Sequence, residues 1–341
     1  GQDSTALRQR LLIRPENLPY TTALGRRIDS GSHRQAFEQA VVWAHDVRQR
    51  RAADARGSIG IGFASYIEGI APNYALTSGL WPAYESCTVR IDPDGKVVVA
   101  GGVCPTGQGL ETMMAGVTSR ALGVPSDDVV VRLGDTDLTP YGLGSFGSRS
   151  TVVASGAILR AGDRLRTKVI EIAAGLLEAD GADLVMADGQ VHVRGSQTSS
   201  VSLADIAAVA YFRTDRLPPG VEPGLEASAA YDPPGIDFRP DADGKMNICV
   251  TYTNSTHAAV VDVDRSTGQV TLLDYLAVHD AGPLLHPQLA DGQVRGGLAQ
   301  GIGGALYEEL TYSPDGQPLV TSFMDYLLPG AGEVPDLTVE H

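Results

Sequence analysis

Three glycine-rich stretches carry the residues that are best suited to chemistry in this sequence. They are residues 107–109, 144–151 and 292–300, and each belongs to the start of a predicted helix. Such a start presents unpaired backbone N–H groups at the positive end of the helix dipole, where phosphate and other anions bind. Each stretch adds a side-chain amide or hydroxyl. Together they predict either a site for a large, phosphate-bearing cofactor or three separate positions of close packing.

Two side chains in these stretches suit a ligand. Gln108 lies between Gly107 and Gly109, where the bare backbone lets a ligand approach while the amide donates and accepts hydrogen bonds. Arg149 is suited to bidentate pairing with a phosphate. The alternative for the first stretch is an ordinary strand-to-helix turn that needs glycine only for its dihedral angles.

Gly142, Gly144 and Gly147 match the dinucleotide-binding pattern Gly-x-Gly-x-x-Gly in form. That pattern requires a preceding strand, and residues 135–141 form a polar turn instead, so no nicotinamide site is predicted. The sequence also has no phosphate-binding loop of the Walker type and no Gly-x-Ser-x-Gly nucleophile turn.

The composition describes a globular protein. Of its 341 residues 43% are hydrophobic and 20% are charged, which is enough apolar material for a core. The net charge of −15 argues against nucleic acid and anionic membranes as partners. No uncharged apolar run is long enough to span a membrane.

Cysteine and histidine usage limits the metal chemistry. Cys87, Cys104 and Cys249 lie far apart, which excludes a disulfide framework and a complete iron–sulfur ligand set within this chain. The seven histidines form no close pair, so a zinc site made by side chains is not predicted. A reducing compartment, the cytoplasm, is expected.

Hydrophobic periodicity predicts the elements that position these stretches. Helices are predicted at residues 33–53, 110–122, 152–177 and 291–310. Strands are predicted at residues 59–64, 84–91, 96–100, 129–133, 184–186, 191–193, 246–252, 258–264 and 269–279. Residues 215–245 concentrate proline, glycine and aspartate and predict a long surface connection. Small residues in the last helix are expected to permit close approach of another backbone.

The motifs and their order carry a resemblance. The first part has Gly107-Gln108-Gly109-x-x-Thr112, Leu122-Gly123-Val124-Pro125, Gly134-Asp135-Thr136 and Gly147-Ser148-Arg149-Ser150-Thr151. The second part has Gly292-Gln293-Val294-x-Gly296-Gly297-x-x-Gln300-Gly301, then Ser322-Phe323-Met324-Asp325-Tyr326-x-x-Pro329. The chain thereby resembles the molybdopterin-binding large subunit of the xanthine dehydrogenase/aldehyde oxidase family over nearly its whole length.

The resemblance implies an α+β fold with mixed sheets and packed helices. It divides the chain into a helical lead-in and linker at residues 1–56 and a first molybdopterin-binding half at residues 57–214. A connection at residues 215–245 and a second molybdopterin-binding half at residues 246–341 follow. The cofactor implied is molybdopterin cytosine dinucleotide with molybdenum, which the cofactor's dithiolene holds and no side chain ligates.

The resemblance also assigns residues to parts of the cofactor. The pterin and its phosphates would be contacted by Gly107, Gln108, Gly109 and Thr112. Phe146 and Gly147 would lie beside the molybdenum. The pterin–pyrophosphate region would be bound by Ser148, Arg149, Ser150 and Thr151. The nucleotide-bearing part would be bound by Gln293, Gly296 and Gln300.

The activity implied is oxidative hydroxylation of a small molecule, an aldehyde or an N-heterocycle, with water as the oxygen source. Electrons would leave through [2Fe–2S] clusters and FAD on an iron–sulfur subunit and an FAD subunit, in a dimer of heteromers. The family's N-terminal part of the large subunit is not in this sequence and is expected on a separate chain or in a longer protein.

The sequence departs from the family at the catalytic base. The family's Gly-Glu segment lies beyond the position of His341, so no catalytic residue is assigned in this chain. Glu333 imitates that segment, but it aligns better with the linker after Tyr326 and is not expected to act as the base. Glu308 and Glu309 are predicted to be exposed carboxylates at a helix end. The alternative function is a non-catalytic cofactor-binding or scaffold member of the family.

Overall fold

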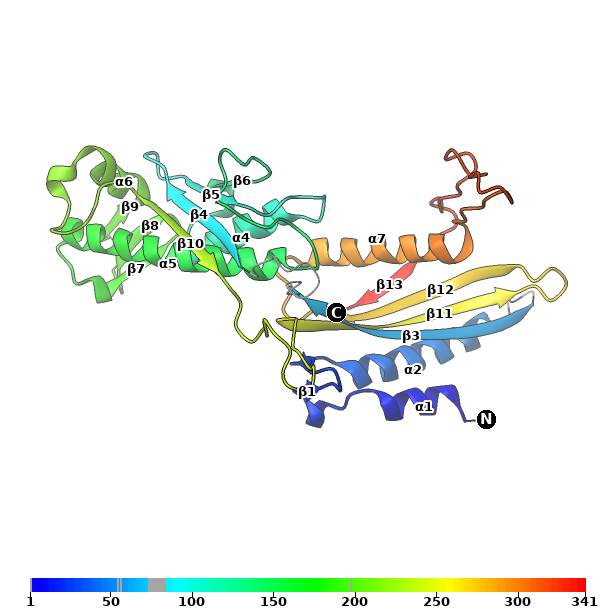
Figure 1. The fold of residues 1–341 in the computed structure, drawn as a ribbon. Coiled ribbons are helices and arrows are strands. Elements are labelled where there is room, and N and C mark those ends of the chain that lie inside the picture. Colours follow the sequence, from blue (N-terminus) through cyan, green and yellow to red (C-terminus); the bar gives the residue numbers. More distant parts are fainter. Residues whose placement is uncertain (1, 54, 56, 73–83, 197) are drawn as a thin grey trace. The chain divides into compact units, whose positions relative to one another are not determined.

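The computed structural model describes residues 2–53, 55, 57–72, 84–196 and 198–341 (Figure 1). The chain divides into two compact units. The terminal unit comprises Gly1–Gly69 and Thr251–His341, and the central unit comprises Ile70–Val250. Each unit has its own sheets and its own hydrophobic core, so each is described by itself.

The central unit is built on a four-stranded sheet with the strand order β10, β4, β5, β6. β5 and β6 run parallel, and the other neighbours run antiparallel. Helices α4 and α5 pack against each other and against this sheet, and α5 also contacts α6 and the small sheet β7-β8-β9. The elements are β4 (Glu85–Ile91), β5 (Val97–Gly101), α4 (Leu110–Leu122), η2 (Ser126–Asp128), β6 (Val129–Arg132), α5 (Ser150–Leu177), η3 (Gly181–Asp183), β7 (Leu184–Ala187), β8 (Gln190–Val193), β9 (Ser200–Ser202), α6 (Leu203–Phe212), η4 (Thr214–Arg216) and β10 (Glu226–Tyr231).

Strand alternation explains how this sheet meets α5. Val89 and Ile91 in β4 and Val99 in β5 are fully buried, because a period of two places them on one face. Helix α5 buries a stripe that includes Ile158 and Leu165 in the same core. The helix that leads away from the second glycine-rich stretch is therefore anchored along its length.

Strand β10 corrects the prediction for residues 215–245. It pairs with β4 from Glu226↔Arg90 to Tyr231↔Glu85, so part of the predicted surface connection belongs to the sheet. Its small residues give no apolar alternation that the sequence could show. Its outer edge is partly satisfied by helix α5, since Arg160 Nη1 donates to the Ala230 carbonyl at 2.9 Å.

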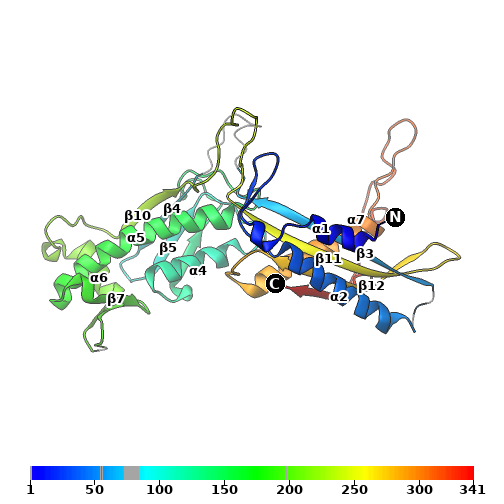
Figure 2. The same ribbon diagram turned by 90° about the horizontal axis from the view of Figure 1, so that it is seen from below.

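The terminal unit contains a second four-stranded sheet, with the order β13, β12, β11, β3. Helix α2 lies on one face of this sheet and α7 on the other (Figures 1 and 2). β11 and β12 form a long antiparallel hairpin, and β13 pairs with β12 in parallel. The elements are α1 (Ser4–Leu11), η1 (Pro15–Asn17), β1 (Tyr20–Thr21), β2 (Arg27–Ile28), α2 (His33–Arg51), β3 (Ser58–Ile70), β11 (Thr251–Val263), β12 (Val270–Asp280), α7 (Pro287–Leu306) and β13 (Leu337–Glu340).

The two faces of this sheet differ in chemistry. Ala258 in β11 and Leu276 in β12 pack against the apolar stripe of α2. Their neighbours His257 and Tyr275 must point to the opposite face, because successive side chains alternate. One face is an apolar core, and the other carries imidazole and phenol groups.

The observed units differ from the divisions expected from sequence. Residues 1–56 do not form a separate lead-in, because α2 packs on β11 and β12. Residues 246–250, predicted as strand, lack regular structure, and the Asn247 side chain holds them by donating to the Gly235 carbonyl at 2.7 Å. Within the described parts of the chain, no helix combines the length and the apolar character needed to cross a membrane.

Candidate functional site

The first and second glycine-rich stretches, residues 107–109 and 144–151, meet in the central unit. They line a cavity of about 300 Å³, here called the loop cavity, whose lining residues are Thr106, Gln108, Ser145, Phe146, Gly147, Ser148, Arg149, Ser150 and Thr151. Gly107 and Gly109 flank Gln108. Thr112, also predicted here, lies on the exposed side of α4 and does not line the cavity.

The start of α5 supplies backbone donors to this cavity. The helix begins at Ser150 without a capping side chain and has no acidic residue in its first turn. Its first N–H groups therefore lack intrahelical partners, and the dipole of a helix of 28 residues favours an anion at this end. Ser150 and Thr151 add hydroxyl groups at the same place.

The backbone of both loops is shaped for a close ligand. Gly107 and Gly144 have φ angles of 90° and 88°, and a β-carbon added at either would meet no atom within 4 Å. Ser148 also adopts the left-handed region, with a φ of 54°. A non-glycine residue in that region costs on the order of 1 kcal/mol and persists only where its surroundings hold it.

Gln108 and Ser145 organise the loops. The Oε1 atom of Gln108 accepts from the Thr106 N–H at 2.6 Å, which leaves the Nε2 donors of that amide for a ligand. Ser145 ties the two loops together, because it accepts from the Cys104 N–H at 3.0 Å and donates to the Cys104 carbonyl at 2.6 Å. Ser150 donates to the Ser145 hydroxyl at 2.9 Å. Ser145 was not predicted from sequence, although it lies inside the second stretch.

Arg149 corrects a prediction. Its side chain is 2% exposed, and its guanidinium pairs with Glu85 at 2.7 Å rather than pointing toward a phosphate. It also donates to the carbonyls of Gly144 and Tyr84, at 2.8 and 2.9 Å. The predicted bidentate contact with a phosphate is thus replaced by contacts within the protein. The guanidinium N–H groups that a phosphate would need donate to the Glu85 carboxylate and to backbone carbonyls instead.

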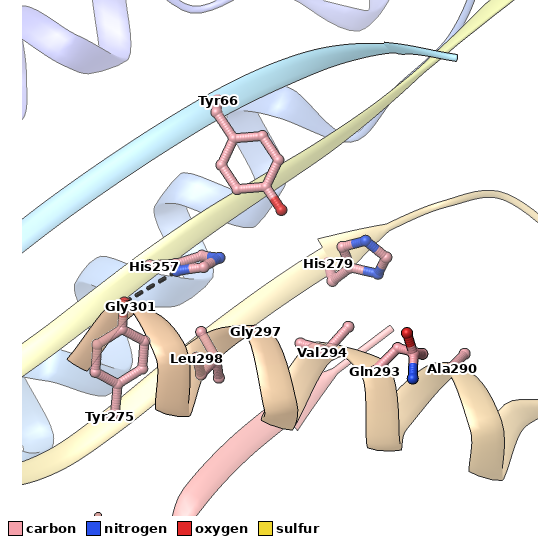
Figure 3. A pocket seen from close by; sticks show the side chains of 10 residues that line it. All are labelled: Tyr66, His257, Tyr275, His279, Ala290, Gln293, Val294, Gly297, Leu298 and Gly301. Carbon is pink, nitrogen blue, oxygen red and sulfur yellow. Dashed lines mark hydrogen bonds between the residues drawn. The ribbon is translucent and has the colours of Figure 1, made fainter. Parts of the chain in front are cut away.

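The third stretch contributes to a different cavity, which lies within the terminal unit. This sheet cavity has a volume of about 450 Å³ and lies between the sheet and α7 (Figure 3). It is lined by Tyr66, His257, Tyr275, His279, Ala290, Gln293, Val294, Gly297, Leu298 and Gly301. Of the predicted residues, Gln293 lines it, whereas Gly296 and Gln300 lie on exposed parts of α7.

The sheet side of this cavity is a layer of neutral polar rings. His257 Nδ1 lies 3.0 Å from the Tyr275 hydroxyl. Burial, and then His279, lower the pKa of His257. Burial, and then His341, lower the pKa of His279. Burial raises the pKa of Tyr66 and of Tyr275. Near pH 7 the rings are therefore uncharged, which suits a planar, neutral group better than an anion.

Most glycines of α7 do not pack closely against another backbone, contrary to the prediction from the sequence. A β-carbon added at Gly296, Gly297 or Gly301 would meet nothing within 4 Å. Gly303 does pack closely, because its β-carbon would lie 2.9 Å from Pro329 Cδ. Most of the helix therefore presents an open glycine surface in the described structure, and close packing is confined to its end.

The carboxylates singled out in the sequence have local partners. Glu333 accepts from the Gly330 N–H in a turn and lines neither cavity. Glu308 is half-buried and not exposed as predicted, because the Tyr326 hydroxyl donates to it. Glu309 is exposed. Across the described ranges, no cluster of three or more histidine, cysteine or acidic side chains is arranged to hold a metal ion.

Comparison with known proteins identifies the family. The molybdopterin cofactor-binding domain matches residues 37–335. The chain belongs to this family. The large chain of carbon monoxide dehydrogenase from Hydrogenophaga pseudoflava is 34% identical over 350 residues, which is 100% of this chain and 42% of that relative. The large subunit of nicotine 6-hydroxylase from Paenarthrobacter nicotinovorans is 32% identical over 98% of this chain and 40% of its own length.

Solved structures agree with this family. Quinoline 2-oxidoreductase from Pseudomonas putida 86 superimposes with a TM-score of 0.84 and 37% identity, covering 99% of this chain and 42% of that one. The predicted family and the predicted α+β class are therefore confirmed. The chain spans 40–42% of the length of these relatives.

Proposed function

We propose that the loop cavity binds the pterin and phosphate groups of a molybdopterin cofactor, and that the chain is the cofactor-binding part of a molybdenum hydroxylase large subunit. The observation that carries this proposal is the uncapped start of α5, which opens into a cavity rimmed with hydroxyl groups. Its donors are backbone N–H groups, the hydroxyls of Ser148 and Thr151, and the Gln108 amide, whereas the Ser150 hydroxyl donates to Ser145. This donor set fits a phosphate without a cation.

The same proposal gives roles to other residues. Phe146 and Gly147 would lie beside the metal centre, and Gly107 and Gly109 would contact the pterin end, whereas Thr112 lies outside the cavity lining and receives no role. Arg149 would not contact the cofactor itself but would position the backbone of the loop, to which it donates hydrogen bonds at the Gly144 and Tyr84 carbonyls. No carboxylate lines the loop cavity within the described residues, and we assign the lining to cofactor binding and not to the role of catalytic base.

For the nucleotide-bearing part, we propose the cytosine dinucleotide form of the cofactor. Support comes from the exposed amides of Gln293 and Gln300 on α7 and from the open surface at Gly296. A pyrimidine ring is planar and neutral, which matches the uncharged rings that line the sheet cavity.

The bound cofactor would supply a molybdenum centre for oxidative hydroxylation with water as the oxygen source. The names of two relatives contain nicotine and quinoline, which favours an N-heterocycle over an aldehyde as the substrate. Iron–sulfur and FAD subunits would accept the electrons. The residues of this chain bind and orient the cofactor.

Metal and nucleotide analysis of the purified protein tests this function. We expect about one molybdenum per chain and an equal amount of CMP after acid hydrolysis. Absence of both would overturn the proposal. Presence of both without hydroxylation of any N-heterocycle or aldehyde, in the complete complex, would favour the non-catalytic alternative.

A further inference from the structure

Glu85 is a fully buried carboxylate at the start of β4. Its side chain is 0% exposed and that of its partner Arg149 is 2% exposed. Taking two charges out of water costs more than their attraction returns unless hydrogen bonds satisfy both groups. A buried pair of this kind is therefore weak evidence for net stability, and its hydrogen bonds show what it holds.

The pair holds both ends of the loop that lines the loop cavity. Glu85 Oε2 accepts from Arg149 Nη1 at 2.7 Å and from the Leu143 N–H at 3.3 Å. Arg149 in turn donates to the Gly144 carbonyl. One ion pair thus fixes the loop where it begins, at residues 143–144, and where it enters α5.

The same carboxylate also contacts the first loop. A β-carbon at Gly102 would lie 2.7 Å from Glu85 Oε1, and one at Gly142 would lie 1.9 Å from it. Gly102 directly precedes the loop that carries Gln108. Both cofactor loops therefore begin against one buried oxygen atom.

Arg149 extends this control to Phe146. The Arg149 guanidinium carbon lies 5.2 Å from the centre of the Phe146 ring, within cation–π range. We propose that Glu85 is a positioning residue of the cofactor site. Acting through Arg149, it sets the backbone of residues 142–149, and with it the Phe146 ring and the start of α5. This inference rests on the proposed function of the loop cavity.

The test compares Glu85→Gln with Leu165→Ala in the cofactor-loaded protein. Gln keeps the shape of Glu and removes its charge, whereas Leu165 lies in the core along α5, away from the cavity lining. We expect Glu85→Gln to raise amide hydrogen exchange in residues 142–149 and to speed loss of molybdenum and CMP, each on the order of tenfold. Leu165→Ala serves as the control at matched stability. After correction for its melting temperature, this variant should change neither the amide exchange of residues 142–149 nor the rate of cofactor loss.

Equal effects of the two variants on loop exchange and cofactor loss, at matched stability, would show a merely structural role and overturn the inference. If Glu85→Gln does not fold, Arg149→Lys replaces it, since it keeps the charge but lacks the planar fork; the same local effects are expected. A wild-type protein without molybdenum and CMP would instead refute the proposed function, so the two failures are distinguishable.

Discussion

The loop cavity and the sheet cavity are built by different means. The loop cavity uses backbone donors, hydroxyls and a helix start, held from behind by the Glu85–Arg149 pair. The sheet cavity uses rings on alternate positions of β11 and β12, such as His257 and His279, facing a glycine-rich helix. The first is suited to an anion and depends on one ion pair, whereas the second is neutral and depends on the register of a sheet.

The largest expected effect is on the pair behind the loop cavity. Arg149→Met leaves the Glu85 charge buried without a partner and should lower the free energy of unfolding by about 3–5 kcal/mol, measured by chemical denaturation. The double variant Glu85→Leu/Arg149→Met should recover most of this stability but not the cofactor. The exposed pair of Arg213 and Asp215 supplies the control, because Arg213→Met should have no measurable effect. A similarly small effect of Arg149→Met would show that the pair does not control the fold of the loop.

A smaller effect is expected on cofactor binding. Gln108→Ala removes donors that face the loop cavity and should weaken cofactor retention by about 1–3 kcal/mol, measured as molybdenum and CMP content after dialysis. Gln293→Ala, on an exposed part of the sheet cavity, should have less effect. Gln269→Ala, in the hairpin between β11 and β12, serves as the control. Equal losses of molybdenum and CMP from all three variants would show that the loop cavity does not bind the cofactor more strongly than the sheet cavity.

The open glycines of α7 should respond in the opposite direction. Gly297→Ala and Gly301→Ala place a methyl group in free space and should raise the stability of the cofactor-free protein by about 0.5–1 kcal/mol. Gly303→Ala should lower it, because the new β-carbon meets Pro329. Thermal denaturation measures all three. Destabilisation by Gly297→Ala would mean that the helix packs more closely than described.

The smallest expected effect is on pH dependence. The pKa values of His257 and His279 are lowered in the folded state, so protons bind more readily to the unfolded chain. Stability should therefore fall as pH drops through the ordinary value of 6.5 and continue to fall toward the lower folded values. Melting temperatures between about pH 7.5 and 5.5 measure this slope. The dependence of melting temperature on pH should be weaker in His257→Gln. An unchanged dependence would show that groups other than His257 cause it.

Local signals allowed much of the loop cavity to be predicted. The strand–glycine–helix order around Gln108 gave α4 with its observed ends, and α5 begins two residues before its predicted start. Turn chemistry and helix periodicity act over a few residues, which is why they can be read from the chain. The family resemblance then predicted a molybdopterin cofactor as the ligand.

Long-range pairing could not be predicted in the same way. Glu85 and Arg149 are separated by 64 positions, and only folding of β4 beside α5 makes them partners. A charged residue at the start of an apolar strand was the only signal for Glu85. Tyr66 and His257 likewise meet through strand register and side-chain alternation, which a sequence without known pairings does not specify.

The packing around Glu85 also constrains the order in which this site can change during evolution. Loss of either Glu85 or Arg149 leaves the other charge buried, and any side chain at Gly142 collides with the carboxylate. A single substitution in this group is therefore expected to lower stability unless a second substitution accompanies it. Residues such as Gln108 and Thr151, which line the cavity, can be substituted without a second, compensating substitution. Adaptation to a different cofactor or substrate is thus expected to begin at the lining residues, whereas Glu85, Arg149 and Gly142 are expected to change together.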